Sequence, residues 1–384
     1  MRSIAGILLI VFLIPACAHE LRLEYLADQN LASGIDVGGT EFGGISALAG
    51  TGDKNNGNSF LALSDDRSEK APARWYQTKI SVTGSGDGKT PAQVILAPGR
   101  PVTMVNFDGK PFPKGSIDPE AMVVMSDGRV FVSSEGDMNQ DPRIDPAVFL
   151  AADDGRVMKT LDVPQVFLPE KSGKQTRGVR NNGAFESMTV TPDGKTLLVA
   201  AELPLIQDGE IPDYSRGGLV RMVRYRLDPG GIVADGQFVY ELSPVKPWPP
   251  EPNAKPHLNG LVEMFYMPSG ELLAMERAGV NQADGSYRTR VRLWQVDLDG
   301  ATDVSGMESL KSTGALPLRA ARKRLVLDLD EILPKLSVGF QSLDNLEAIH
   351  VGPDLPDGTK TLILVSDNNF NASQRTQVLL FAVR

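Results

Sequence analysis

One pattern recurs five times along the chain and limits what it can fold into. Each copy is a short apolar run, a turn that usually holds Gly and Asp, and a second apolar run that ends in a carboxylate. The copies begin at Ser46, Glu120, Glu186, Glu263 and Glu347. Asp-Gly between two β-rich runs is a strong hairpin signal, because Gly adopts a positive φ at little cost and Asp tolerates it. The pattern therefore predicts five β-hairpins.

Further strand-like stretches follow these hairpins. Each of the first four is followed by two, at 75–82 and 92–96, 147–152 and 157–163, 219–227 and 236–242, and 290–298 and 324–329. The fifth is followed only by Gln377–Val383, and Leu21–Leu26 is available to complete it. The sequence predicts an all-β fold, a β-propeller of five four-stranded blades closed by pairing of the N- and C-terminal strands. Six blades and an open β-sandwich remain alternatives, and residues 20–384 are expected to form a single domain.

The composition agrees with this architecture and narrows the partners. The 38 Gly and 27 Pro favour many short elements joined by tight turns. The 48 acidic and 39 basic residues give a formal net charge of −9, so we expect no nucleic-acid partner. A single cysteine excludes a disulfide framework and a thiolate metal cluster, and three histidines argue against a multi-histidine zinc centre.

The N-terminus has the pattern of an export signal. A positively charged start precedes an apolar run at 4–14, which is too short to span a bilayer. Ile14-Pro15-Ala16-Cys17 is similar to a bacterial lipobox, so we expect residues 1–16 to be removed and Cys17 to be lipidated as the first mature residue. Cleavage after Ala18 by ordinary signal peptidase remains the alternative. The prediction is a bacterial cell-envelope protein, either an outer-membrane-anchored lipoprotein or a periplasmic or secreted one, with membrane contact only through the anchor.

Hairpin geometry predicts two rings of polar residues at one mouth of the propeller, because a first strand starts where its antiparallel partner ends. The first ring is Ser46, Glu120, Glu186, Glu263 and Glu347, and the second is Asp65, Glu135, Glu202, Glu276 and Asp367. Nine carboxylates cannot share one funnel as free anions, so protons, arginines or hard divalent cations must neutralise them. We expect these nine residues to hold a divalent metal, Ca²⁺ being the first candidate. The alternative is that each carboxylate accepts backbone hydrogen bonds at a blade edge.

Basic residues are predicted on the same side. Arg67, Arg74, Arg180 and Arg277 are candidates for binding a small anionic substrate or ligand, since the guanidinium fork suits phosphate and carboxylate. Surface ion pairing is the alternative. Glu186 and His257 are the catalytic candidates, although a solitary loop histidine is more often structural. The sequence contains no nucleophile elbow, HExxH, Walker loop or GxGxxG motif.

An ordered series of motifs spans most of the chain. It comprises Gly43-Gly44-Ile45-Ser46, Ser64-Asp65-Asp66-Arg67, Ala73-Arg74-Trp75-Tyr76, Asp118-Pro119-Glu120, Ser134-Glu135, Asn182-Gly183-Ala184-Phe185-Glu186, Glu276-Arg277, Asn345-Leu346-Glu347 and Ser366-Asp367-Asn368-Asn369-Phe370. The series resembles the bacterial phytase-like domain, also called "esterase-like activity of phytase", over roughly residues 36–384. Ala184 and Leu346 depart from the residues common at those positions. The resemblance implies an exported propeller-like domain with phosphoester or ester hydrolysis, and it identifies no catalytic residue.

Two classes of function follow from the sequence. One is a metal-assisted hydrolase of phosphate esters or esters, in which the carboxylates hold the ion and the arginines hold the substrate. The other is a non-catalytic propeller of the cell envelope that binds a ligand or a protein at the same mouth. A propeller serves either role, so the fold alone does not decide between them.

Overall fold

The computed structural model describes residues 20–52, 58–245, 255–281, 287–311 and 317–384. The predicted signal segment 1–16 and Cys17 lie outside the described residues. His257 lies in a described strand, but its side chain is outside the description. Among the described residues, no helix combines the length and the apolar character needed to cross a membrane.

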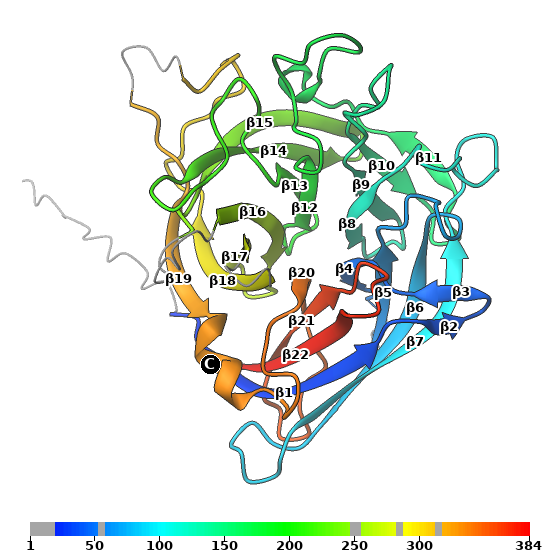
Figure 1. Cartoon of the computed structure of the whole chain (residues 1–384), viewed down its shortest axis with the longest axis vertical. Helices are drawn as coiled ribbons and strands as arrows, with labels where there is room; N and C mark the ends of the chain where they lie inside the picture. Colours follow the sequence, from blue (N-terminus) through cyan, green and yellow to red (C-terminus); the bar gives the residue numbers. More distant parts are fainter. Residues whose placement is uncertain (1–19, 53–57, 246–254, 282–286, 312–316) are drawn as a thin grey trace, which may run out of the picture.

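Five four-stranded antiparallel sheets surround a central axis (Figure 1). From the axis outward, blade 1 consists of β4 (Ile45–Gly50), β5 (Ser59–Ser64), β6 (Arg74–Thr83) and β7 (Gln93–Thr103), and blade 2 of β8 (Pro119–Val124), β9 (Val130–Ser134), β10 (Ala147–Ala151) and β11 (Val157–Thr160). Blade 3 consists of β12 (Phe185–Val190), β13 (Thr196–Ala201), β14 (Gly218–Asp228) and β15 (Gly231–Leu242), and blade 4 of β16 (Lys255–Tyr266), β17 (Leu272–Asn281), β18 (Tyr287–Asp297) and β19 (Arg322–Asp328). Blade 5 consists of β20 (Asn345–Val351), β21 (Thr361–Asp367), β22 (Arg375–Val383) and β1 (Leu23–Ala32). The innermost strands β4, β8, β12, β16 and β20 contact one another in a ring.

The two ends of the described chain close this ring. β1 supplies the outer strand of blade 5 and pairs antiparallel with β22, so that Leu23 lies opposite Val383 and Ala32 opposite Arg375. This confirms the prediction of five blades closed by the terminal strands, and the six-bladed and sandwich alternatives do not apply. A short hairpin of β2 (Ile35–Val37) and β3 (Thr40–Phe42) links the closing strand to blade 1. Two 3₁₀ helices, η1 (Gln165–Phe167) and η2 (Leu329–Lys335), lie in connecting segments.

The core is divided among the gaps between neighbouring blades. Leu63 and Trp75 of blade 1, for example, pack with Val132 of blade 2. Equivalent buried clusters fill the gaps between blades 2 and 3, 3 and 4, 4 and 5, and 5 and 1. Blade strands covered on both faces read as nearly continuous apolar runs, such as Leu197–Ala201. This packing fixes the innermost strands, and with them the groups that they carry to the axis.

Every innermost strand carries a β-bulge, close to the start of the strand in β4, β8, β12 and β20 and further along in the longer β16, which has another bulge between Pro256 and Leu258. The pairing register shifts between Ile45 and Ala47, Pro119 and Met122, Phe185 and Ser187, Leu261 and Glu263, and Leu346 and Ala348. A bulge leaves a residue out of the ladder and re-aims its side chain. The bulges leave Ser46, Glu186 and Glu347 unpaired in blades 1, 3 and 5, and Glu120 together with Ala121 in blade 2. Four of the five bulges therefore present a polar residue at the same end of the axis.

Candidate functional site

The bulges also define which residues are equivalent at the ends of the second strands. In blades 1, 2, 3 and 5 the residue before the bulge pairs with the last or next-to-last residue of the second strand, and in blade 4 it pairs with a residue in the middle of the longer β17. In every blade we take the next residue of the second strand as the one at the mouth. These following residues are Asp65, Glu135, Glu202, Arg277 and Asp367. In blade 4 the bulge leaves Val262 unpaired, and Leu261 pairs with Glu276. The predicted equivalence of Glu263 and Glu276 with the other ring members is therefore wrong by one residue at both positions, because the bulge shifts the register there.

Glu276 instead lies between blades 3 and 4, where its carboxylate is already occupied. It accepts hydrogen bonds from Tyr240 Oη at 2.7 Å and from the Ser243 amide at 3.2 Å, and it forms an ion pair with Lys323. Its side chain is 2% exposed. Glu276 thus has a structural partner of opposite charge, and the mouth receives the neighbouring Arg277 in its place.

Eight carboxyl side chains gather at this end of the axis, and we refer to them as the acidic mouth: Asp65, Asp118, Glu120, Glu135, Glu186, Glu202, Glu347 and Asp367. Within the mouth, one ligand-capable oxygen from each of Asp118, Glu120 and Glu135 lies within 4.8 Å of the others. In the part of the chain that the structure describes, this is the one group of three metal-ligating side chains that converge so closely. Seven of the nine predicted metal ligands are thus brought together, with Asp118 added.

Burial and mutual repulsion favour the protonated forms of these carboxyls. Burial raises the pKa of Asp118 to about 7, against the opposing effect of Arg67. Burial also raises the pKa of Glu202 to about 7, and burial with the charge of Glu347 raises that of Asp367 to about 8. Burial and neighbouring carboxylates likewise raise the pKa of Glu186 well above its usual range. Without a cation, the mouth holds protons at neutral pH.

Arg277 is the cation at the centre of this cluster. Its Nη1 donates to Glu347 and to the amide oxygen of Asn345, and its Nη2 lies 3.5 Å from Glu202 Oε1. Asn345 Nδ2 in turn donates to Glu347 at 2.9 Å and to Asp367 at 3.3 Å. Opposing carboxylates raise the Arg277 pKa against the effect of burial, so this residue is charged. One arginine offsets only part of the negative charge that eight ionised carboxyls would carry.

Two buried carboxylate oxygens of the mouth accept no hydrogen bond within the described residues: Asp65 Oδ1, and Glu202 Oε1, whose nearest cation is the Arg277 guanidinium at 3.5 Å. A glycine makes room for each of them. A Cβ atom on Gly44 would collide with Asp65 Oδ1, and one on Gly260 would collide with Glu202 Oε1. Gly44 also has a φ of +62°, which favours glycine. Buried carboxylate oxygens that accept no hydrogen bond, in an oxygen-only donor set, fit a hard divalent cation such as Ca²⁺.

The four predicted substrate-binding arginines occupy different environments. Arg67 lies at the edge of the mouth, with Nε 3.5 Å from Asp118 and Nη2 2.8 Å from Asp137, and its side chain is 31% exposed. Arg277 lies inside the mouth, as described above. Arg180 donates to the backbone carbonyls of Pro204 at 2.9 Å and Gly209 at 2.6 Å, and so ties two loops together. Only Arg67 combines contact with the acidic mouth and substantial exposure.

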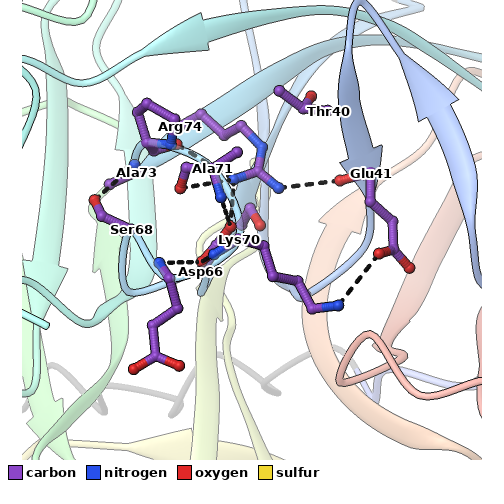
Figure 2. A network of polar contacts seen from close by, with 12 residues as sticks. Thr40, Glu41, Asp66, Ser68, Lys70, Ala71, Ala73 and Arg74 are labelled. Atoms are coloured by element: carbon purple, nitrogen blue, oxygen red, sulfur yellow. Dashed lines mark hydrogen bonds and ion pairs between the residues drawn. The ribbon is translucent and has the colours of Figure 1, made fainter. Parts of the chain in front are cut away.

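Arg74 is buried in a network of its own (Figure 2), with its side chain 1% exposed. Its guanidinium donates to Asp66 at 2.7 Å and to the Glu41 carbonyl at 3.0 Å. The Asp66 carboxylate also accepts the backbone amides of Glu69, Lys70 and Ala71. Burial would raise the Asp66 pKa, but Arg74 and these amides lower it overall. The network holds the loop after β5 in place, and this loop carries Asp65 and Arg67. Arg74 therefore helps to position these two residues, although its own side chain is not part of the mouth.

Asp118 and Asn345 are the mouth residues that the ring argument missed. Each lies two residues before a ring glutamate, in Asp118-Pro119-Glu120 and Asn345-Leu346-Glu347. The repeated spacing of a polar residue two positions before the ring glutamate was a usable signal. His257, the second catalytic candidate, has its side chain outside the described residues. The remaining histidine near the axis, His350, is partly buried, and its two ring nitrogens contact the Gly50 amide and the Val351 carbonyl.

The sequence also matches known proteins. The family model described as "Phytase-like: Esterase-like activity of phytase" matches residues 40–370, and the chain belongs to this family. An uncharacterized secreted protein of Arthroderma benhamiae is 27% identical over 184 residues, which is 42% of this chain and 34% of that protein. The chain thus spans about a third of the length of this curated relative.

Solved structures with similar folds share little sequence with the chain. The catalytic domain of a GH62 α-L-arabinofuranosidase from Coprinopsis cinerea has a TM-score of 0.38 at 10% identity, covering 94% of this chain and 97% of that one. A gluconolactonase from Xanthomonas campestris has a TM-score of 0.30 at 9% identity, again covering 94% and 97%. A soluble aldose sugar dehydrogenase from Escherichia coli has a TM-score of 0.35 at 13% identity, covering 95% and 99%. We draw no functional conclusion from these likenesses.

Proposed function

We propose that this member of the phytase-like family is an exported, metal-assisted hydrolase of phosphate esters or carboxylic esters that acts at the acidic mouth. The observation that carries the proposal is the convergence of Asp118, Glu120 and Glu135 within a cluster whose carboxyls far outnumber its arginines. A purely structural cluster would balance its buried charges, since an uncompensated buried charge is strongly destabilising. The excess of acid supports a site completed by a cation.

Asp118, Glu120 and Glu135 would hold the ion, and Asp65 and Glu202 of the same mouth have further oxygens that accept no hydrogen bond. All of these donors are carboxylate oxygens, which suits Ca²⁺ with its six to eight oxygen ligands. When bound, such an ion supplies concentrated positive charge that stabilises negative charge developing on ester oxygens.

The protein's own residues would bind the substrate and handle its proton. Arg67 is partly exposed beside Asp118, so its guanidinium can hold a phosphate or carboxylate group of a small anionic substrate. Glu186 is buried in the mouth, and its raised pKa lets it keep a proton near neutral pH and donate it to a leaving alkoxide. Arg277 would position Glu202 and Glu347 and limit their repulsion.

The test is turnover of p-nitrophenyl phosphate and p-nitrophenyl butyrate in calcium and in chelator, together with metal analysis of the purified protein. We expect hydrolysis that requires calcium and falls on the order of a hundredfold in Glu135→Gln. Asp127→Asn, a charge removed at an exposed turn of the same blade, is the control and should retain activity. Arg67→Ala should raise KM for the phosphate ester about tenfold, with a smaller effect on the butyrate.

Two results would contradict the hydrolase. Equal turnover in calcium and in chelator would show that hydrolysis does not require a metal ion. Calcium binding without hydrolysis of either ester would instead favour the second function, a non-catalytic propeller that binds a ligand or a protein of the cell envelope.

We further propose export to a bacterial cell envelope with a lipid anchor on Cys17. The apolar run at 4–14 and the lipobox-like Ile14–Cys17 support it, and the description of the Arthroderma benhamiae relative as secreted is consistent with export. Cys17→Ser should move the protein from the membrane fraction to the soluble envelope fraction while leaving its melting temperature unchanged. Unchanged fractionation would contradict the anchor and favour cleavage after Ala18.

A further inference from the structure

A second compartment lies on the propeller axis, at the end of the hairpin turns. It is a cavity of about 540 Å³ lined by the later halves of all five innermost strands. Its rim includes the exposed turn residues Ser126, Asp193 and Pro268, and its wall includes the buried Glu263. The residues of the acidic mouth do not line it. Its size is within the range of about 300–1,000 Å³ that is typical of small-molecule sites.

The lining is mainly apolar. Four methionines, Met122, Met125, Met188 and Met264, belong to the lining, and Phe265 and Ile349 add further apolar residues. Methionine adapts its shape to a ligand and makes favourable contacts with aromatic rings. Asp193 and Glu263 are the acidic residues of the lining, and the described lining contains no lysine or arginine. A phosphate or sulfonate group would therefore enter this cavity without a cation to receive it.

His350 does not change this conclusion. Its Nε2 accepts the Gly50 amide at 3.0 Å, and its Nδ1 lies 2.8 Å from the Val351 carbonyl. Burial lowers the His350 pKa, which keeps the ring neutral. Its ring packs against those of Phe60 and Phe265 with centroids 5.4 and 4.9 Å away. The histidine therefore contributes aromatic surface to the wall and no positive charge.

Glu263 gives the cavity its one deeply buried carboxyl group among the described lining residues. The residue is 3% exposed, and its Oε1 accepts the backbone amides of Met264 at 2.8 Å and Met188 at 3.3 Å. Among the described residues, no hydrogen bond engages Oε2. A buried carboxyl with one oxygen anchored by amides has its other oxygen available to a ligand. The amide bonds also fix the direction of the group.

We propose that this cavity is a second binding site, which takes an uncharged, largely apolar small molecule with one polar group that hydrogen-bonds Glu263. The apolar wall supplies most of the affinity, and Glu263 fixes the orientation of the ligand. The site does not depend on hydrolysis at the acidic mouth, because the two compartments have different linings and opposite requirements for ligand charge.

The charge requirement can be tested with two probes that share one scaffold. N-phenyl-1-naphthylamine is uncharged and carries one N–H donor, whereas 1-anilinonaphthalene-8-sulfonate adds a sulfonate to the same ring system. We expect the full-length protein to bind the uncharged probe saturably with one site per chain, measured by fluorescence titration. The sulfonate should bind at least about tenfold more weakly, because no cation lines the cavity. Equal binding of both probes, or no saturable binding of either, would overturn the proposal.

Variants place the probe in the cavity. Val124→Trp adds an indole to a lining position and should weaken binding of the uncharged probe at least about tenfold, as should Val190→Trp on the next blade. Ile95→Trp adds the same group at a site that is 49% exposed on β7 and should leave binding unchanged. Glu263→Met removes the acceptor and should lose about fivefold, and Glu263→Gln should lose at least as much, because its one carbonyl oxygen stays with the two backbone amides and its NH2 then faces the N–H of the probe. Circular dichroism and melting curves identify any variant that fails to fold.

Binding that survives both tryptophans in folded protein would show that the probe sits elsewhere and would overturn the site. Binding in folded Glu263→Met equal to that in the wild type would overturn the role of Glu263. Calcium-dependent ester turnover is measured separately in the same protein. Loss of turnover with retained probe binding would refute the proposed hydrolase and leave this site standing.

Discussion

Two groups of buried charge in this propeller have opposite balances. Asp208 and Arg221 in blade 3 form a one-to-one pair in which both side chains are fully buried. Arg221 Nε and Nη2 contact the two Asp208 oxygens at 2.7 and 3.1 Å, and the other donors of Arg221 reach Gln237 and the carbonyls of Val304 and Met307. Asp208 also accepts the Leu310 amide at 2.8 Å. This pair is complete by itself and ties the 304–310 loop to the blade.

In the acidic mouth, by contrast, the buried acidic groups outnumber the basic ones. Eight carboxyls share Arg277 and Arg67, and two of their buried oxygens accept no hydrogen bond in the described residues. The difference shows how to separate a structural ion pair from a site that needs a ligand. Stability at a balanced pair should be indifferent to metal and to moderate changes of pH, whereas stability at the mouth should depend on both.

Arg221→Met should have the largest effect on stability. It leaves Asp208 buried without its partner, which costs about 3–5 kcal/mol in the free energy of unfolding. Urea unfolding in calcium and in chelator should give the same loss, because no part of the acidic mouth is touched. A loss that calcium reverses would show that the two groups are coupled and would remove the basis of the comparison.

Arg277→Met should cost less, and the cost should depend on conditions. In chelator at pH 8 we expect a loss of about 2–4 kcal/mol, because Glu202 and Glu347 lose their shared cation. Calcium, or a shift to pH 5.5, should recover at least half of it by neutralising the carboxylates. Arg277→Lys keeps the charge and serves as the control, with a smaller loss expected. If the free energy of unfolding falls equally in chelator at pH 8, in calcium and at pH 5.5, then Arg277 has a purely structural role, as Arg221 does.

Metal-free wild-type protein should lose stability as the pH rises from about 4 to about 8. Burial holds the folded-state pKa near 7 for Asp118 and Glu202 and near 8 for Asp367, above the value of about 4 in the unfolded chain. In this window the folded protein binds more protons than the unfolded one, so the free energy of unfolding falls with pH, by a few kcal/mol in total. Calcium should flatten the curve at pH 8. Stability that rises over this range in chelator would contradict the raised pKa values.

Much of the fold could be predicted because its signal is local and repeated. The hairpin pattern recurs with its turn residues and apolar runs, and each copy forms the two innermost strands of a blade. The closing pair was also accessible, since blade 5 lacked a fourth strand and Leu21–Leu26 was unused. Observed β1 runs further, from Leu23 to Ala32, because it continues along the whole of β22.

The site was predicted less completely, because a β-bulge changes register without changing the sequence pattern. In blade 4 both Glu263 and Glu276 fit the hairpin pattern, yet the bulge at Val262 turns Arg277 toward the mouth. Arg74 looked like a mouth residue from its position after β5, but its guanidinium is bound by Asp66 in the preceding loop and by the Glu41 carbonyl of β3, which is distant in sequence. At a bulge or in a loop, the direction of a side chain depends on tertiary packing. The alternation of apolar and polar residues along the sequence carries no information about that packing.

Glu186→Gln should have the smallest effect on stability and is the most informative change, because its sign is expected to reverse. Glu186 is buried among Glu135, Glu202 and Glu347, which raise its pKa together with burial. In chelator at pH 8 the wild-type protein must either keep a proton on Glu186 or hold a repelling charge there, and Gln needs neither, so the melting temperature should stay the same or rise by an amount worth about 1 kcal/mol. In saturating calcium it removes part of the charge that attracts the ion, so calcium affinity and melting temperature should both fall. Glu210→Gln, at an exposed loop position, should change neither. If Glu186→Gln costs the same in calcium and in chelator, the carboxyl acts only through its local contacts, and the mouth is balanced in the same way as the Asp208–Arg221 pair.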